Sequence, residues 1–333
     1  MKESEIRPEE LFSEYLRLSA EDAKKYFSDK NTGRQYRDCP ACGRDNAELE
    51  FEKLGFNYVR CDFCHSLYAN PCPEEELLAE YYRDSESSKY WAEVFFPTVS
   101  GIRREKIFRE RANKINELFH TAKIELNKII DVGAGFGIFL EEIQKQFPKA
   151  IIAAVEPSTV LARECKNKGF PTMEGFAHDA ANKSEWKESA DLVTSFEVIE
   201  HIINPLQFIN DMKSLIKTGG TLLITGLFGD GFDIQILGLH SKSISPPHHI
   251  NFLSRRGVDL LMERADLKLV NFITPGKLDV DIVRNALSEN KELVKDPFLL
   301  DLLLNADEKT QDNFQKFLSE NCLSSHMWIL ARS

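Results

Sequence analysis

The pattern of apolar and polar residues predicts buried strands that alternate with amphipathic helices. Short apolar runs at 128–132 and 150–155 lack helical spacing, which is typical of strands buried on both faces of a parallel sheet. Between these runs, apolar residues recur at helical spacing until Pro148 ends the pattern. Further strands are expected at 171–174, 191–195, 221–225, 267–274 and 327–331. This order of elements predicts an α/β fold.

A glycine-rich turn follows the first strand, with Asp131 before it and glycines at Gly133, Gly135 and Gly137. Glycine permits a tight turn, and the start of the following helix offers unpaired N–H groups to a ligand. The dinucleotide-binding pattern G-x-G-x-x-G does not fit, because Ile138 stands where its third glycine belongs. The turn therefore predicts a different ligand, with a purely structural turn as the alternative.

Two further residues extend this candidate pocket. Glu156 ends the second strand roughly twenty residues after the turn, where an acid accepts hydrogen bonds from ribose hydroxyls. The alternative is a solvated loop glutamate. Asp131 suits a ligand whose amino-acid end carries an ammonium group. Phe176, after the third strand, is a candidate wall for an adenine ring or a core residue.

Four cysteines have the spacing of a metal site. Cys39, Cys42, Cys61 and Cys64 follow the pattern C-x2-C-x18-C-x2-C, which is typical of a tetrahedral zinc ribbon. Four thiolates leave no open coordination position, so the predicted Zn²⁺ is structural rather than catalytic. His65 is an alternative ligand in place of Cys64.

Charge and composition narrow the class of protein. The 333 residues carry a formal net charge of −11, and the predicted ribbon has no basic excess, so nucleic-acid binding is not expected. The charged first residues lack the apolar core of a signal peptide, and the most apolar stretch, 221–228, is too short to cross a bilayer. We therefore expect a cytoplasmic protein without membrane insertion.

A basic helix is predicted from Ile102 onward. Its positive residues are Arg103, Arg104, Lys106, Arg109, Arg111 and Lys114. These side chains form a solvated face, or one or two of them contact an anionic substrate such as a phosphate or a nucleotide sugar.

The chain resembles the class I S-adenosylmethionine (SAM) methyltransferases related to ubiquinone-biosynthesis O-methyltransferases (methyltransferase-domain 23 type). The resemblance covers about residues 125–275 and rests on G-x-G-x-G, on F-E-V-I-E-H-I-I-N-P from Phe196, and on K-T-G-G-T-L-L-I. It implies a seven-stranded, doubly wound, Rossmann-like sheet with one antiparallel strand. SAM would lie across strands 1, 2 and 4, lined by Phe196 and Glu197. Glu197, Glu200 and His201 match positions where some relatives bind Mg²⁺; a packing role for His201 is the alternative.

A long connection at 226–247 precedes His248 and His249. Methyl transfer requires an aligned nucleophile and a proton acceptor, and histidine suits the second role. The run H-H-I-N-F-L-S resembles the substrate-face loop of this methyltransferase group. His249 is the first candidate for the base and His248 the second. In the alternative, one histidine caps the next helix and the other is solvated.

The expected acceptor is a small molecule, sugar-like or anionic. The segment 274–283 resembles a signature of bacterial methyltransferases encoded among surface-polysaccharide genes. Its Asp279 and Asp281 would contact substrate or cap a helix. An RNA methyltransferase and a non-catalytic SAM-binding partner protein are the alternatives. The sequence makes no prediction of the oligomeric state.

The sequence predicts four parts of the chain. They are a helical arm (1–35), a zinc ribbon (36–72), a helical cap (73–124) and a methyltransferase domain (125–333) with a helical insertion at about 276–325.

Overall fold

The centre of the molecule is a mixed sheet of seven strands, seen in a computed structural model that describes residues 1–28 and 33–333. Residues 29–32, in the predicted helical arm, lie outside the described residues. The strand order is β12-β13-β10-β9-β6-β7-β8, and β13 runs antiparallel to both of its neighbours. The strands are β6 (Lys128–Val132), β7 (Ile151–Glu156), β8 (Thr172–Glu174), β9 (Ala190–Phe196), β10 (Ile216–Leu227), β12 (Lys268–Ile273) and β13 (His326–Arg332). The predicted fold class is confirmed.

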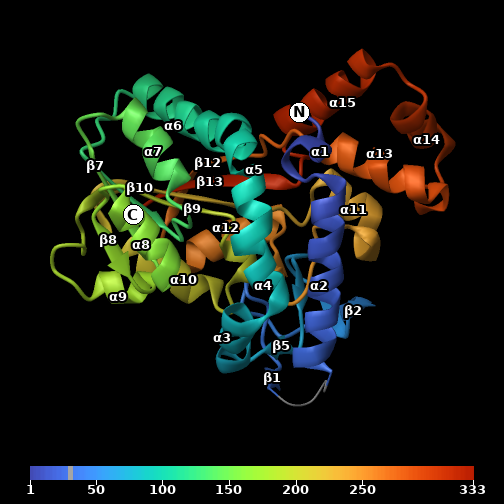
Figure 1. Cartoon of the computed structure of the whole chain (residues 1–333), viewed down its shortest axis with the longest axis horizontal. Coiled ribbons are helices and arrows are strands. Elements are labelled where there is room, and N and C mark those ends of the chain that lie inside the picture. Colours follow the sequence, from blue (N-terminus) through green and yellow to red (C-terminus); the bar gives the residue numbers. More distant parts are fainter. Residues whose placement is uncertain (29–32) are drawn as a thin grey trace.

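Helices cover both faces of this sheet (Figure 1). The helices are α6 (Arg109–Thr121), α7 (Ile138–Gln146), α8 (Thr159–Asn167), α9 (Ala177–Ala181), α10 (Pro205–Lys213) and α12 (Arg255–Arg264). Ile129 packs in one core with residues of α6 and α7, whereas Ile130 packs in a second core with residues of α10 and α12. Successive strand residues point to opposite faces, so burial on both sides requires the continuous apolar run seen in the sequence.

The cysteine-bearing segment forms a small sheet that the main part of the chain completes. Its strands are β2 (Ala47–Lys53), β3 (Phe56–Cys61), β4 (Leu67–Ala69) and β11 (Asn251–Phe252), and β1 (Arg34–Gln35) pairs separately with β5 (Cys72–Pro73). Strand β11 is antiparallel to β4, with Asn251 opposite Tyr68. The ribbon therefore contacts the segment that directly follows the two candidate histidines.

A layer of helices stands beside this junction. It consists of α1 (Glu3–Ile6), α2 (Glu9–Phe27), α3 (Glu75–Asp84), α4 (Glu86–Tyr90) and α5 (Phe96–Arg103), with π-helical turns at Trp91–Phe95 and Arg104–Phe108. Figure 1 shows α2 running alongside α4 and α5. Tyr15 of α2 packs against Trp91 with ring centroids 5.0 Å apart. The ring of Tyr15 also lies 5.9 Å from that of His248, between centroids, so the first helices of the chain contact the segment of the candidate histidines.

The chain between β12 and β13 adds α13 (Asp279–Glu289), the 3-10 turn Lys291–Leu293, α14 (Pro297–Leu304) and α15 (Glu308–Glu320). These helices form an apolar core with Leu237 of α11 (Phe232–Leu237). Further 3-10 turns lie at Ile199–His201 and Gly238–His240. Helix α11 lies within the long connection at 226–247 and packs on the added helices. Within the described residues, no helix is long and apolar enough to span a membrane.

Candidate active site

The glycine turn lies at the carboxyl end of β6 and has room beside it for a ligand. Gly133 and Gly135 have φ values of 78° and 55°, in the left-handed region that favours glycine. A Cβ atom on Gly133 would lie 2.7 Å from Val198, so a larger residue would clash there. A Cβ atom on Gly135 would meet no atom within 4 Å. The open space at Gly135 fits the close approach of a cofactor to the backbone.

Glu156 is attached to this turn. Strands β6 and β7 are parallel neighbours, so their carboxyl ends lie side by side. The Glu156 carboxylate accepts hydrogen bonds from the backbone N–H groups of Gly135 (2.7 Å) and Ser158 (2.9 Å). The residue is only 5% exposed, and burial raises its pKa. Glu156 is therefore not a solvated loop residue, and its carboxylate has a defined position beside the turn.

Asp131 lies deeper, between β6 and β9. Its Oδ1 accepts a hydrogen bond of 2.6 Å from the hydroxyl of Thr194, and burial raises the pKa of Asp131 to about 7. The partner Thr194 has no signal in the sequence, because the contact depends on the pairing of two strands far apart in the chain.

Glu197 is the centre of an ion network that the sequence analysis missed. Its Oε1 accepts hydrogen bonds from Arg111 (2.7 Å) and from the hydroxyl of Thr225 (2.7 Å), and Nδ1 of His326 lies 3.4 Å away. Burial opposes ionisation, yet the charges of His326 and Arg111 hold the pKa of Glu197 well below its usual value. The neighbouring Phe196 packs on Phe139, with ring centroids 4.4 Å apart. Among the three partners of Glu197, only Arg111 had a sequence signal, as part of the basic helix.

Phe176 lies apart from the core. It precedes α9, directly after β8, and is 57% exposed. Its ring stacks on His178 with centroids 5.7 Å apart and an interplanar angle of 10°. The alternative of a core residue is therefore wrong, and the exposed ring stays available to a ligand.

Three imidazole rings gather near the junction with the ribbon. The ring centroids of His201 and His249 are 4.8 Å apart, and those of His201 and His248 are 6.4 Å apart. His248 shares a hydrogen bond of 2.8 Å with the hydroxyl of Tyr81, and His201 shares one of 3.0 Å with Tyr82. Neither candidate histidine caps the next helix, because Ser254 does so.

His249 has a defined tautomer. Its Nδ1 lies 2.6 Å from the carbonyl oxygen of Ser243, so Nδ1–H donates and Nε2 keeps its lone pair. Burial lowers the pKa of His249 to about 4 and that of His248 to about 3. Both rings are therefore neutral near pH 7, and Nε2 of His249 can accept a proton.

Glu200, His201 and His249 offer ligand atoms that all lie within 4.8 Å of one another, a grouping that could hold a metal ion. Glu200 is buried, its Oε2 has no hydrogen-bond partner among the described residues, and burial raises its pKa well above its usual value. This set differs from the one that the resemblance implied, because Arg111 and Thr225 engage Glu197 and His249 takes its place.

The four cysteines converge. The sulfur atoms of Cys39 and Cys64 are 3.5 Å apart, as are those of Cys42 and Cys61, and all four lie within 4.8 Å of one another. Zinc–sulfur bonds of about 2.3 Å in a tetrahedron require sulfur separations of this size. His65 is not among the clustered residues, so the predicted four-thiol set fits a zinc ribbon without it.

The ribbon also positions the histidine segment. The guanidinium of Arg37 donates to the carbonyl oxygens of Ile203 (2.6 Å) and Ile250 (3.1 Å) and to Oδ1 of Asn251 (2.8 Å). The hydroxyl of Tyr58 donates to the carbonyl oxygen of His249 at 2.6 Å. The backbone of His249 and its neighbours therefore depends on ribbon side chains.

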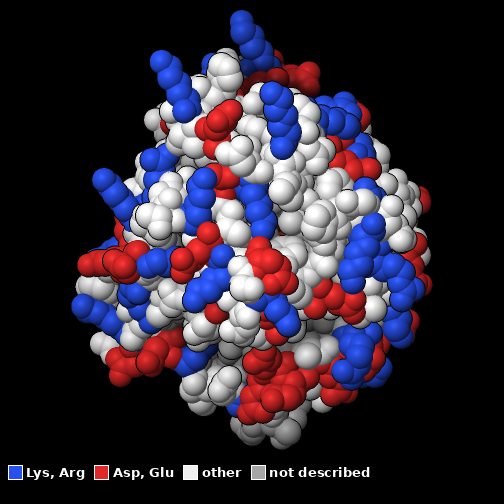
Figure 2. Space-filling model, turned by 90° about the vertical axis from the view of Figure 1, so that its left-hand side faces the viewer, with Lys and Arg blue, Asp and Glu red and all other residues white. Residues whose placement is uncertain are grey.

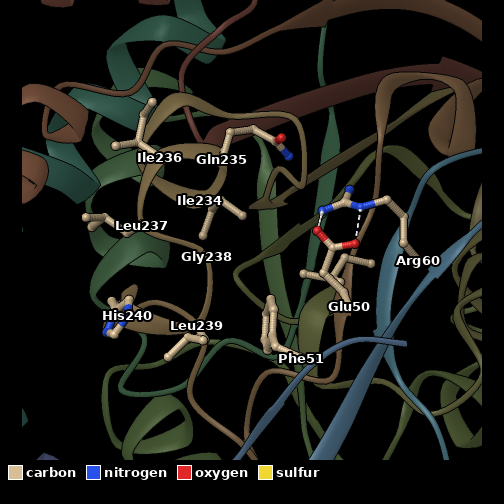
Figure 3. A pocket seen from close by; sticks show the side chains of 11 residues that line it. Glu50, Phe51, Arg60, Ile234, Gln235, Ile236, Leu237, Gly238, Leu239 and His240 are labelled. Carbon is tan, nitrogen blue, oxygen red and sulfur yellow. Dashed lines mark hydrogen bonds and ion pairs between the residues drawn. The ribbon is translucent and has the colours of Figure 1, made fainter. Parts of the chain in front are cut away.

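A separate cavity of about 280 Å³ lies between the ribbon and α11. Figure 3 shows Glu50, Phe51 and Arg60 on one side and residues 234–240 on the other, with Arg60 paired to Glu50. None of the predicted cofactor or catalytic residues lines it. This cavity is therefore distinct from the candidate active site.

Charges are mixed on the face that Figure 2 presents, where Lys and Arg alternate with Asp and Glu. That view shows the left-hand side of Figure 1, and no continuous basic surface covers it. This face therefore lacks the positive field that phosphate-backbone binding requires.

Comparisons with known proteins give concordant results. A family model described as a methyltransferase domain matches residues 103–271. The mitochondrial ubiquinone biosynthesis O-methyltransferase of Dictyostelium discoideum is 29% identical over 135 residues, covering 37% of this chain and 41% of that protein. Malonyl-[acyl-carrier protein] O-methyltransferase 1 of Ilyobacter polytropus is 28% identical over 119 residues, covering 35% and 44%. The matches thus span less than half the length of these relatives.

Among solved structures, a SAM-dependent methyltransferase from Archaeoglobus fulgidus has a TM-score of 0.48 at 16% sequence identity. That match covers 72% of this chain and 100% of the other.

Proposed function

This chain belongs to the methyltransferase-domain family, and on that premise we propose that it transfers the methyl group of SAM to an oxygen atom of a small-molecule acceptor. The observation that carries the proposal is the bond from Gly135 to Glu156 beside an open glycine turn. The Glu156 carboxylate and the backbone of Gly135 therefore lie together at the carboxyl ends of two parallel strands. Open α/β sheets bind their ligands at this edge.

The cofactor would be held by residues of three strand ends. Glu156 accepts hydrogen bonds from the ribose hydroxyls, Phe176 covers the adenine, and Asp131 stands near the ammonium of the methionine part. The remaining proposed contacts are Gly133, Gly135, Gly137, Phe196 and Glu197. When bound, SAM supplies an activated methyl group on a positively charged sulfur.

We assign proton acceptance to Nε2 of His249, because Ser243 holds that ring in the required tautomer. His248 becomes a positioning residue, since its Nε2 is already bonded to Tyr81. The neutral ring of His249 would align the acceptor hydroxyl and take its proton as the methyl group transfers.

The choice of oxygen rests on the relatives, which are named O-methyltransferases. A sugar or nucleotide sugar is the acceptor that we propose to test first, on the resemblance of residues 274–283. Two carboxylates of that segment already have partners within the protein. Asp279 accepts hydrogen bonds from Ser324 and Ser325, and Asp281 accepts one from the backbone of Glu3. Acceptor contacts would therefore come from other residues.

We also propose that Cys39, Cys42, Cys61 and Cys64 bind a structural Zn²⁺, which the separations of their sulfur atoms support. Metal analysis of the purified protein should find one zinc per chain. A protein that keeps its fold with no zinc and four free thiols would contradict this proposal.

The test of the function is transfer of label from methyl-labelled SAM to a panel of nucleotide sugars, phenols and RNA. Transfer of the label to an oxygen atom of a small acceptor supports the proposal, and transfer to RNA alone contradicts it.

The same assay with and without added Mg²⁺ tests whether Glu200, His201 and His249 bind a cation that the reaction needs. A protein that binds SAM yet methylates nothing would be the non-catalytic partner.

A further inference from the structure

Arg103 is a half-buried cation that forms no ion pair with another described residue. It ends α5, and its guanidinium lies 5.8 Å from the ring centre of Trp91 and 5.7 Å from that of Phe96. Among the described residues, its buried Nε has no hydrogen-bond partner, and no ion pair forms with its side chain. Burial lowers the pKa of Arg103 to about 9; the positive charges of Arg7 and Arg111 add to this effect, and the negative charge of Glu197 opposes it. Such a desolvated cation gains from an anionic partner.

The neighbouring arginines of the basic helix are already neutralised. Arg104 donates to the carboxylates of Glu141 (2.7 Å) and Glu142 (2.9 Å), and Arg111 donates to Glu197 (2.7 Å). Among the described residues, the basic helix therefore contains arginines with carboxylate partners and one, Arg103, that contacts aromatic rings but forms no ion pair.

Aromatic contacts connect Arg103 to both parts of the candidate active site. Phe96 stacks on Phe136 of the glycine turn, with ring centroids 4.4 Å apart and an interplanar angle of 4°. In the other direction, Trp91 packs on Tyr15, and Tyr15 lies 5.9 Å from His248. Arg103 is therefore located between the proposed cofactor turn and the histidines.

Arg7 approaches the same space from the N-terminal helices. Its guanidinium lies 5.1 Å from the ring centre of Phe12, and it pairs with Glu3 only at 3.5 Å. Its charge also contributes to the lowered pKa of His249, after the larger effect of burial. A second cation thus lies within electrostatic reach of both Arg103 and the proposed base.

We propose that Arg103, assisted by Arg7, binds an anionic oxygen group of the methyl acceptor, either a phosphate or a carboxylate. This inference rests on the proposed function, because it assumes that the acceptor lies between the methyl donor and His249. The planar guanidinium, lying against the rings of Trp91 and Phe96, presents several N–H donors in one orientation, which suits such groups.

The test is calorimetric titration of anions into protein saturated with S-adenosylhomocysteine (SAH). Uridine monophosphate and pyrophosphate probe the phosphate source, and benzoate and citrate probe the carboxylate source. Arg103→Gln should weaken binding of the preferred anion by roughly 10- to 100-fold, since it removes charge-assisted hydrogen bonds at a partly buried position. Arg7→Gln should weaken it less.

Arg104→Gln is the matched control, because it removes the same charge one residue away. It should bind anions as the unaltered protein does. Thermal unfolding of Arg103→Gln should occur at or above the unaltered midpoint, because the substitution removes a partly desolvated charge that forms no ion pair with the described residues.

Several results would overturn the inference. Equal anion affinity in Arg103→Gln and Arg104→Gln, or no anion binding by the SAH complex, would remove its basis. Loss of SAH affinity in Arg103→Gln, with anion binding intact, would assign Arg103 to the cofactor instead. Failure of the unaltered protein to bind SAH would overturn the proposed function and this inference together.

Discussion

The proposed donor side and acceptor side of the active site are built in different ways. The main part of the donor side (Asp131, the glycine turn 133–137 and Glu156) comes from one stretch of chain, in which a backbone N–H of the turn donates to the Glu156 carboxylate; Phe176, Phe196 and Glu197 complete it from the ends of β8 and β9. The acceptor side (Arg7, Arg103, His201, His248 and His249) comes from four distant segments that packing brings together. Cofactor binding on the donor side should therefore be little affected by substitutions in other parts of the chain. The geometry of the acceptor side should depend on the whole tertiary structure and on the ribbon.

Loss of zinc should produce the largest effect and should separate the two sides. We expect Cys61→Ser to lower the thermal unfolding midpoint by more than about 5 °C, because structural zinc contributes several kcal/mol to folding. Tyr58 and Arg37 would then no longer hold the histidine segment, so turnover should fall further than SAH affinity.

Cys322→Ser is the control for this experiment, since Cys322 lies outside the cysteine cluster. Thermal scans, metal analysis and SAH titration of both variants are the measurements. Equal losses of turnover and SAH affinity in Cys61→Ser would show that the ribbon does not act preferentially on the acceptor side.

Removal of the proposed base comes next. His249→Ala should lower turnover by roughly 100-fold or more while SAH affinity stays unchanged, because only the acceptor side loses its proton acceptor. The exposed His240, in the same connection, provides the control His240→Ala. The measurement is the steady-state rate of both variants with a methyl acceptor identified by the label-transfer screen. Near-normal turnover in His249→Ala would refute the assignment of His249 as the base.

Glu156→Gln should act on the donor side alone. It keeps the size of the side chain but weakens hydrogen bonds to ribose, so SAH affinity should fall by roughly 10- to 30-fold. Glu174→Gln, at the exposed end of β8, is a control with the same change of charge. If both variants bound SAH equally well, the assignment of Glu156 to the ribose would fail.

The smallest effect should be the pH dependence near neutrality. Burial lowers the pKa of His249 to about 4, and the ring must be deprotonated to accept a proton. We therefore expect kcat/KM to stay level from pH 8 to about pH 5 and to decline below that. A titration near the ordinary histidine pKa of about 6.5, lost in His249→Ala, would contradict the buried neutral ring.

The sequence predicted those features that depend on short spacings. Apolar runs identified the central strands, glycine spacing identified the turn, and the paired cysteines identified the ribbon. Each signal lies within a few residues, and the local backbone conformation produces it directly.

The acceptor side could not be predicted in the same way. Which arginine of the basic helix faces inward depends on where Glu141 and Glu142 of α7 lie relative to α5 and the π-helical turn that follows it. The pairing of β11 with β4 and the contact of His326 with Glu197 join residues far apart in the chain. Helix α11 was missed because its six residues are too few to establish a period beside flanking glycines.

Calorimetric titration of SAM and SAH into the purified chain is the decisive measurement for the proposed cofactor site. We expect one binding site per chain, with affinity reduced in Glu156→Gln and retained in His249→Ala. Absence of binding by both compounds, with NAD bound instead, would contradict this expectation.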